Sequence, residues 1–99
     1  MNLTSNTFSL DLEIDRINHS IFLTKKHMDE LQKMIVRKLN VKNQYFFEYV
    51  HQNYGNISTP ETRQLIMTYN LLEDSLKELQ AVKSDLTKLR KVSEKMNVN

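Results

Sequence analysis

The fold is decided by the stretch Asn53-Tyr54-Gly55-Asn56-Ile57-Ser58-Thr59-Pro60-Glu61, which holds the only glycine and the only proline among 99 residues. An all-β or α/β fold needs a turn every ten residues or so, and such turns favour Gly and Pro. Two turn formers placed this close together allow one sharp reversal of the chain. The sequence therefore predicts an all-α protein made of two long helices.

The residues of this reversal fit the end of one helix and the start of another. Gly55 can adopt the left-handed conformation that ends a helix. Ser58 with Glu61 fits a capping box, and Thr59 followed by Pro60 fits an N-cap with proline at the first helical position. We expect a turn at 55–59 that depends on Gly55, Ser58, Thr59 and Pro60.

Before the turn, apolar residues recur in alternating steps of four and three, which is the heptad pattern of a coiled coil. Ser9 with the acids that follow it fits a helix start, so we expect helix 1 at about 9–54 and a flexible segment at 1–8. A break at 40–43 is the alternative, although no Gly or Pro requires it. The predicted core positions of helix 1 are Leu10, Ile14, Ile17, Ile21, Met28, Leu31, Ile35 and Leu39.

After the turn, leucines recur every seventh residue through a second helix, expected at about 60–96. Its predicted core positions are Leu65, Tyr69, Leu72, Leu76, Leu79 and Leu86. Beyond Leu79 the apolar flank moves to the other side of the leucine row, where it consists of Val82, Leu89 and Met96. An apolar stripe that drifts around the helix in this way is typical of a helix that supercoils with its partner helix.

The charges favour an antiparallel hairpin, which would form a single domain over 9–99. Residues 25–42 are basic, whereas 43–82 are acidic, so folding back near position 57 brings opposite charges together. We expect Lys38 to lie near Asp74 in this register. Exposed pairs contribute only about 0–1 kcal/mol each, so the apolar heptads must supply most of the stability.

A second set of apolar residues lies off the predicted core. Leu12, Leu23, Met34 and Tyr45 recur every eleven residues, and helix 2 adds Ile66, Met67 and Leu71. A single antiparallel neighbour cannot cover both sets. Scattered surface residues would explain some of them. We expect the rest to close a four-helix bundle with another helical protein or with a second copy of the chain.

Aromatic residues concentrate just before the turn, where they fit either a plug for the closed end of the hairpin or a docking tip. Aromatic side chains dominate interface energetics because they remove large areas from water. The predicted partner-binding residues are Leu12, Leu23, Met34, Tyr45, Phe46, Phe47, Tyr49 and Tyr54.

Motifs of catalysis and ligand binding are missing from the sequence. It has no Cys, no Gly-rich phosphate loop, and only one Glu-x-x-His unit at Glu48 and His51, where a di-iron bundle needs two. Basic runs are mixed with acids, as on solvated helix faces. We therefore expect no enzyme activity, no cofactor or metal, no small-molecule substrate and no nucleic acid.

The amino end lacks the features of a secretory signal, and no apolar run is long enough to span a membrane. We therefore expect a cytoplasmic protein, with leaderless export left open.

In length and layout, with Asn53-Tyr54-Gly55 at the turn, the chain resembles the small helical-hairpin proteins of type VII secretion, the W-x-G family and its partners. Members of that family carry an aromatic-x-x-x-acid export motif after helix 2, and the tail at 89–95 lacks it. The resemblance therefore implies a targeting role, in which the hairpin acts as an adaptor or chaperone for the helical region of a larger exported protein. The alternatives are a constitutive subunit of a coiled-coil assembly and a bacteriocin-immunity-type bundle.

Overall fold

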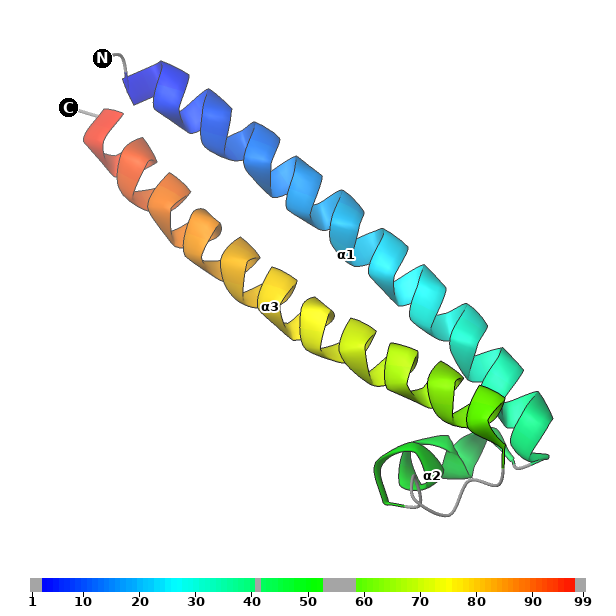
Figure 1. The fold of residues 1–99 in the computed structure, drawn as a ribbon. Coiled ribbons are helices and arrows are strands. Elements are labelled where there is room, and N and C mark those ends of the chain that lie inside the picture. Colours follow the sequence, from blue (N-terminus) through cyan, green and yellow to red (C-terminus); the bar gives the residue numbers. More distant parts are fainter. Residues whose placement is uncertain (1–2, 41, 53–58, 98–99) are drawn as a thin grey trace. The chain divides into compact units, whose positions relative to one another are not determined.

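The computed structural model describes residues 3–40, 42–52 and 59–97, and they are helical almost throughout, without a strand. Two long helices, α1 (Leu3–Leu39) and α3 (Pro60–Asn97), pack against each other as an all-α hairpin (Figure 1). Between them lie a short 3₁₀ helix η1 (Asn43–Tyr45) and a seven-residue helix α2 (Phe46–Gln52). The predicted fold class and the bounds of the second helix are confirmed.

The first helix differs from its prediction at both ends. It begins at Leu3 and not at residue 9, because nothing between Leu3 and Ser9 breaks a helix. It ends at Leu39, since Asn40 has a positive φ of 54°. Asn tolerates the left-handed conformation better than other residues with a Cβ. The alternative of a break at 40–43 is therefore correct, and the single helix to residue 54 is wrong.

The start of α3 follows one of the two predicted capping patterns. The Thr62 backbone N–H donates to Thr59 Oγ1 at 3.2 Å, and the Arg63 N–H donates to the Thr59 carbonyl at 3.1 Å. Pro60 is the first residue of the helix. Thr59 is therefore the N-cap of α3, as the Thr-Pro pair predicts. Gly55 and Ser58 lie outside the described residues.

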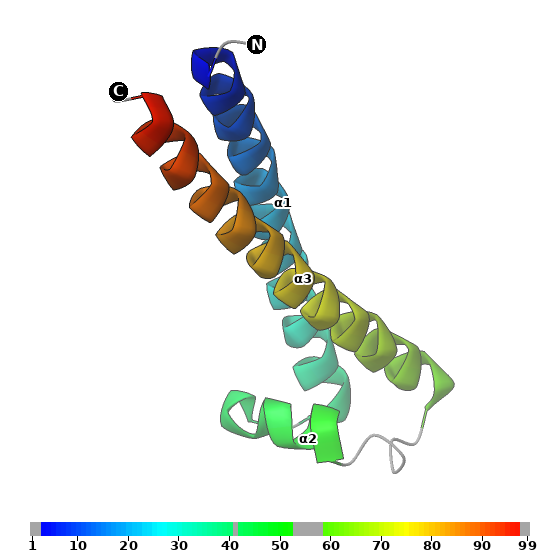
Figure 2. The same cartoon turned by 90° about the vertical axis from the view of Figure 1, so that its left-hand side faces the viewer.

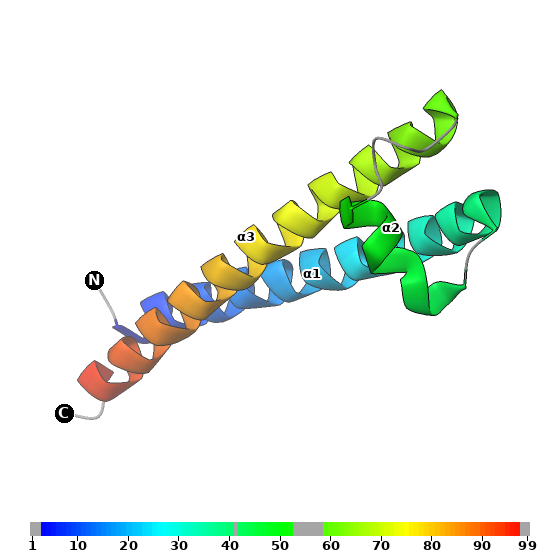
Figure 3. The ribbon, with the colours of Figure 1, turned by 90° about the horizontal axis from the view of Figure 1, so that it is seen from below.

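The chain divides into two compact units, each of which contains part of α1 and part of α3. Unit 1 combines Met1–Leu23 with Leu76–Asn99, and unit 2 is Thr24–Ser75. Within each unit the two long-helix segments run antiparallel (Figures 1 and 2). In unit 2, α2 lies across these segments and not along them (Figures 2 and 3).

The core of unit 2 is dense and uses three helices. Ile35 of α1, Phe46 of α2 and Ile66 of α3 are each 0% exposed. The other buried residues of unit 2 are Met28, Leu31, Val50, Thr62 and Tyr69. Ile66 therefore belongs to the core, and its assignment to the off-core set is wrong. The same unit contains a third helix that the sequence did not predict, and its Phe46 packs against Tyr69 of α3.

The core of unit 1 is much thinner, because only two helix segments contribute to it. Ile14 and Ile21 are its only buried residues among those described. The remaining predicted core positions of this unit are half-buried, namely Leu10, Ile17, Leu76, Leu79 and Leu86. A two-helix pair therefore leaves much of its apolar seam in contact with water.

Ion pairs connect the long helices within each unit. Arg90 donates to Asp11 at 3.2 Å in unit 1, and Lys38 donates to Glu61 at 3.0 Å in unit 2. The expected neighbour of Lys38 was Asp74, so that register is wrong. The reason is that α1 ends at Leu39 and the residues at 43–52 form η1 and α2, so they do not extend the first long helix.

Candidate interaction surfaces

The aromatic residues of α2 divide between the core and the surface. Phe46 is 0% exposed and packs edge-on against Tyr69 of α3, with ring centroids 4.9 Å apart. Phe47 is 53% exposed and touches Phe46 edge-on at 5.4 Å. Consecutive helical residues point about 100° apart, so both cannot enter one core. Phe46 therefore fixes α2 in unit 2, and its assignment to a docking surface is wrong.

Two of the predicted aromatic docking residues remain on the surface of unit 2. Tyr45 is exposed, as is Phe47. The side chain of Tyr49 and the whole of Tyr54 lie outside what the structure describes. The aromatic cluster thus acts partly as the predicted plug and partly as exposed surface.

A polar contact holds α2 against α3 beside these rings. His51 Nε2 lies 3.3 Å from Glu73 Oε1, and this contact becomes an ion pair when His51 is protonated. Burial raises the pKa of the neighbouring Tyr69 hydroxyl, and the Glu73 carboxylate adds to the rise. Both effects keep Tyr69 neutral and suited to a core position.

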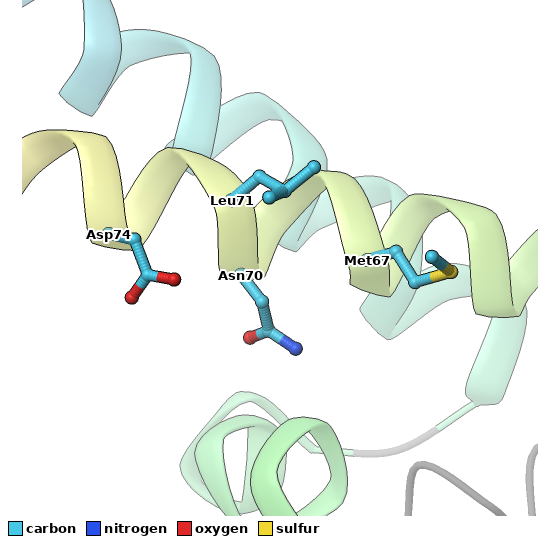
Figure 4. A pocket seen from close by; sticks show the side chains of 4 residues that line it. All are labelled: Met67, Asn70, Leu71 and Asp74. Atoms are coloured by element: carbon cyan, nitrogen blue, oxygen red, sulfur yellow. The ribbon is translucent and has the colours of Figure 1, made fainter.

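The flank of α3 in unit 2 carries a shallow hollow of about 320 Å³, lined by Met67, Asn70, Leu71 and Asp74 (Figure 4). The side chains of Asn70 and Asp74 extend from the same side of the helix. Asn70 Oδ1 is buried without a hydrogen-bond partner among the described residues. Another hollow of about 260 Å³ is lined by Met34, Arg37 and Lys38 of α1. Both hollows are open surface features, and the described residues that line each of them belong to a single helix.

Unit 1 exposes a row of apolar side chains on α3. Val82, Leu89, Val92 and Met96 are between 45% and 56% exposed, and they are spaced as the a and d positions of a heptad. We call these four residues the α3 row. Beside it, Leu89 and Ser93 line a hollow of about 320 Å³ with Ser9 and Leu10 of α1. The seven-residue spacing of Val82, Leu89 and Met96 is present in the sequence, where it predicts a flank of the core and not an exposed row.

The predicted partner-binding residues on α1 are exposed but do not form one patch in either unit. Leu12 and Leu23 lie in unit 1, where the neighbouring Phe22 is 61% exposed. Arg16 and His19, both exposed, lie between Leu12 and Leu23 along the helix. Met34 lies in unit 2. The α3 row is therefore the longer apolar surface, and the sequence-based list of docking residues missed it.

Among the described residues, no group of three or more His, Cys, Asp or Glu side chains is placed to hold a metal ion. None of the helices described is long and apolar enough to cross a membrane. The chemistry on the surface of these units is that of exposed apolar side chains flanked by charges.

Comparison with models of known protein families, with curated proteins and with solved structures found no match. The resemblance to the hairpin proteins of type VII secretion thus gains no support from these comparisons and stays a prediction.

Proposed function

We propose that the chain is a non-enzymatic interaction protein that binds a helical segment of another protein along the α3 row. The observation that carries this proposal is the exposure of Val82, Leu89, Val92 and Met96 in a unit whose described core has only two buried residues. Exposed apolar surface arranged in heptads is what a helix needs in order to accept another helix. Covering this row would give unit 1 the third helix that unit 2 already has.

The energetics favour a larger contact than the row alone. Fully burying a Val, Leu or Met side chain contributes about 1.5–3 kcal/mol, so covering a half-exposed one recovers roughly half of that. Four such residues recover about 3–6 kcal/mol, whereas association itself costs an estimated 4–15 kcal/mol. A stable complex must therefore also use the hollow beside Leu89 and the charges next to the row.

The test is co-purification from the native host with a tagged chain and two sets of substitutions. Val82→Ser, Leu89→Ser and Val92→Ser together remove three of the four apolar side chains of the row. Lys77→Ser with Lys91→Ser changes exposed residues of the same helix that are outside it. We expect a stoichiometric partner with the wild type and the control, and at least a tenfold lower yield with the row variant. This tenfold loss corresponds to about 1.4 kcal/mol.

Circular dichroism of each purified variant shows whether its helical content is kept. If the folded row variant captured the same partner in the same amount, the α3 row would not be the binding surface. Sedimentation of the isolated chain over a range of concentrations shows whether a second copy is the partner.

A further inference from the structure

The charges beside the α3 row indicate the chemistry of the helix that covers it. With Val82, Leu89 and Met96 at heptad position a, Lys88 and Lys95 both fall at position g, one heptad apart. Both lysines are exposed, and no described residue forms an ion pair with either. The other flank of the row faces α1, where Ser93 lines the hollow with Ser9. The lysines therefore border the side of the row that α1 leaves open.

The other nearby charges do not cancel this positive edge. Arg90 is already paired with Asp11 at 3.2 Å and lies 3.9 Å from Glu94, so Glu94 has its own cation. Asp85 is exposed at position d, one turn before Leu89. The described segment 83–95 holds five basic residues and two acids. A helix lying on the row faces the acid Asp85 first. Toward the C-terminal end it then faces Lys88 and Lys95, which have no ion-pair partner among the described residues.

This inference rests on the proposed function. We propose that the occupant of the row is an amphipathic helix of a different protein. It carries an apolar heptad row and acidic residues, seven positions apart, that face Lys88 and Lys95. Charges at positions e and g select the partner of a coiled coil, and here they select an acidic flank. The lysine stems also widen the apolar contact, because Lys packs its methylenes on apolar surface while its ammonium reaches a carboxylate.

A second copy of the chain fits this surface less well. Its own α3 would bring the same basic segment against Lys88 and Lys95, and like charges at facing positions are unfavourable. The part of its α1 that belongs to unit 1 is more acidic, but that segment places the exposed Arg16 and His19 between Leu12 and Leu23 and offers no continuous apolar row. The charge pattern and the apolar spacing together favour a different, acidic helix.

The experiment uses two synthetic helical peptides of about four heptads with the same apolar row, one flanked by Glu and one by Lys. Fluorescence anisotropy measures their binding to the full chain at low and at high salt. For the wild type we expect the Glu-flanked peptide to bind about three- to tenfold more tightly, because two exposed ion pairs replace two repulsions. High salt should reduce this difference because it screens exposed charges.

Charge-reversal variants make the test specific. Lys88→Glu with Lys95→Glu should invert the order of the two peptides, whereas Lys77→Glu with Lys91→Glu makes the same change of net charge outside the row and should preserve it. The acidic-helix inference would be overturned if the Lys88→Glu, Lys95→Glu variant kept the wild-type preference, or if the two peptides bound the wild type equally well. Binding along the row would stand in either case.

The remaining outcomes are equally decisive. If neither peptide bound the folded wild-type chain, both this inference and the proposed function would fail. A chain that sediments as a dimer, and becomes a monomer when Leu89 and Val92 are changed to Ser, would identify a second copy as the occupant and overturn the acidic partner.

Discussion

At the scale of single residues, Asn40 sets the length of the first helix. Its φ of 54° is left-handed, and this conformation ends α1 at Leu39. Gly takes such a conformation without steric cost, Asn takes it at a moderate cost, and a residue such as Ala is strongly disfavoured there. The left-handed Asn40 thus separates α1 from the short helices η1 and α2 that follow it.

Substitution at position 40 tests this geometry directly. We expect Asn40→Ala to lower the free energy of unfolding by about 1 kcal/mol, and Asn40→Gly to leave it unchanged or raise it slightly. Urea denaturation followed by circular dichroism measures both. In a continuous helix the order would be reversed, because Ala is the best helix former and Gly one of the poorest. A more stable Asn40→Ala variant would therefore show that α1 continues past Leu39.

At the scale of elements, α2 is stable only through its tertiary contacts. Seven residues are too few for an isolated helix in water. Phe46 and Val50 enter the core of unit 2, and His51 reaches Glu73. These contacts place Phe47 on the surface, next to the fully buried ring of Phe46.

The two adjacent phenylalanines should respond very differently to truncation. Phe46→Ala leaves a cavity in the core and should lower the free energy of unfolding by about 3–5 kcal/mol. Phe47→Ala removes an exposed ring and should cost less than about 1 kcal/mol. Chemical denaturation of the two variants makes the comparison. Similar losses for both would mean that α2 is not anchored through Phe46.

How far the sequence predicts the structure depends on how local each signal is. The heptads, the Thr59-Pro60 start and the scarcity of Gly and Pro are local, and they correctly predict two long helices. The short helix α2 arises from one left-handed Asn and from distant contacts such as Phe46 with Tyr69, which no spacing reveals. The heptad spacing of the α3 row can be read from the sequence. The sequence does not show whether these side chains are buried or exposed, because that depends on how many helices pack in unit 1.

At the scale of the whole molecule, the buried residues are distributed unevenly. Unit 2 contains eight of the ten buried residues described, and unit 1 contains Ile14 and Ile21. The helix α3 contributes to both units. Its first part therefore packs in the dense core of unit 2, and its last part packs in the thin core of unit 1. Local stability follows buried apolar contact, and segments used for binding come from the less stable end of the range.

Native-state hydrogen exchange can measure this difference within a single helix. We expect the amides of α3 at 66–73 to exchange at least about tenfold more slowly than those at 82–93, because opening the first segment disrupts a three-helix core. Mass spectrometry of peptic fragments gives both rates in one experiment. Equal protection along the helix would show that unit 1 is already complete without a partner.

Site-specific photo-crosslinking in cells can show whether another helix covers the α3 row. A photoreactive amino acid is placed at Leu89 in one chain and at Lys77, exposed on α3 but outside the row, in another. Both chains are then irradiated in living cells of the native host. We expect a discrete crosslink from position 89 to a helical segment of a different protein, with little from position 77. Equal, diffuse crosslinking at both positions, or no adduct at position 89, would contradict this expectation.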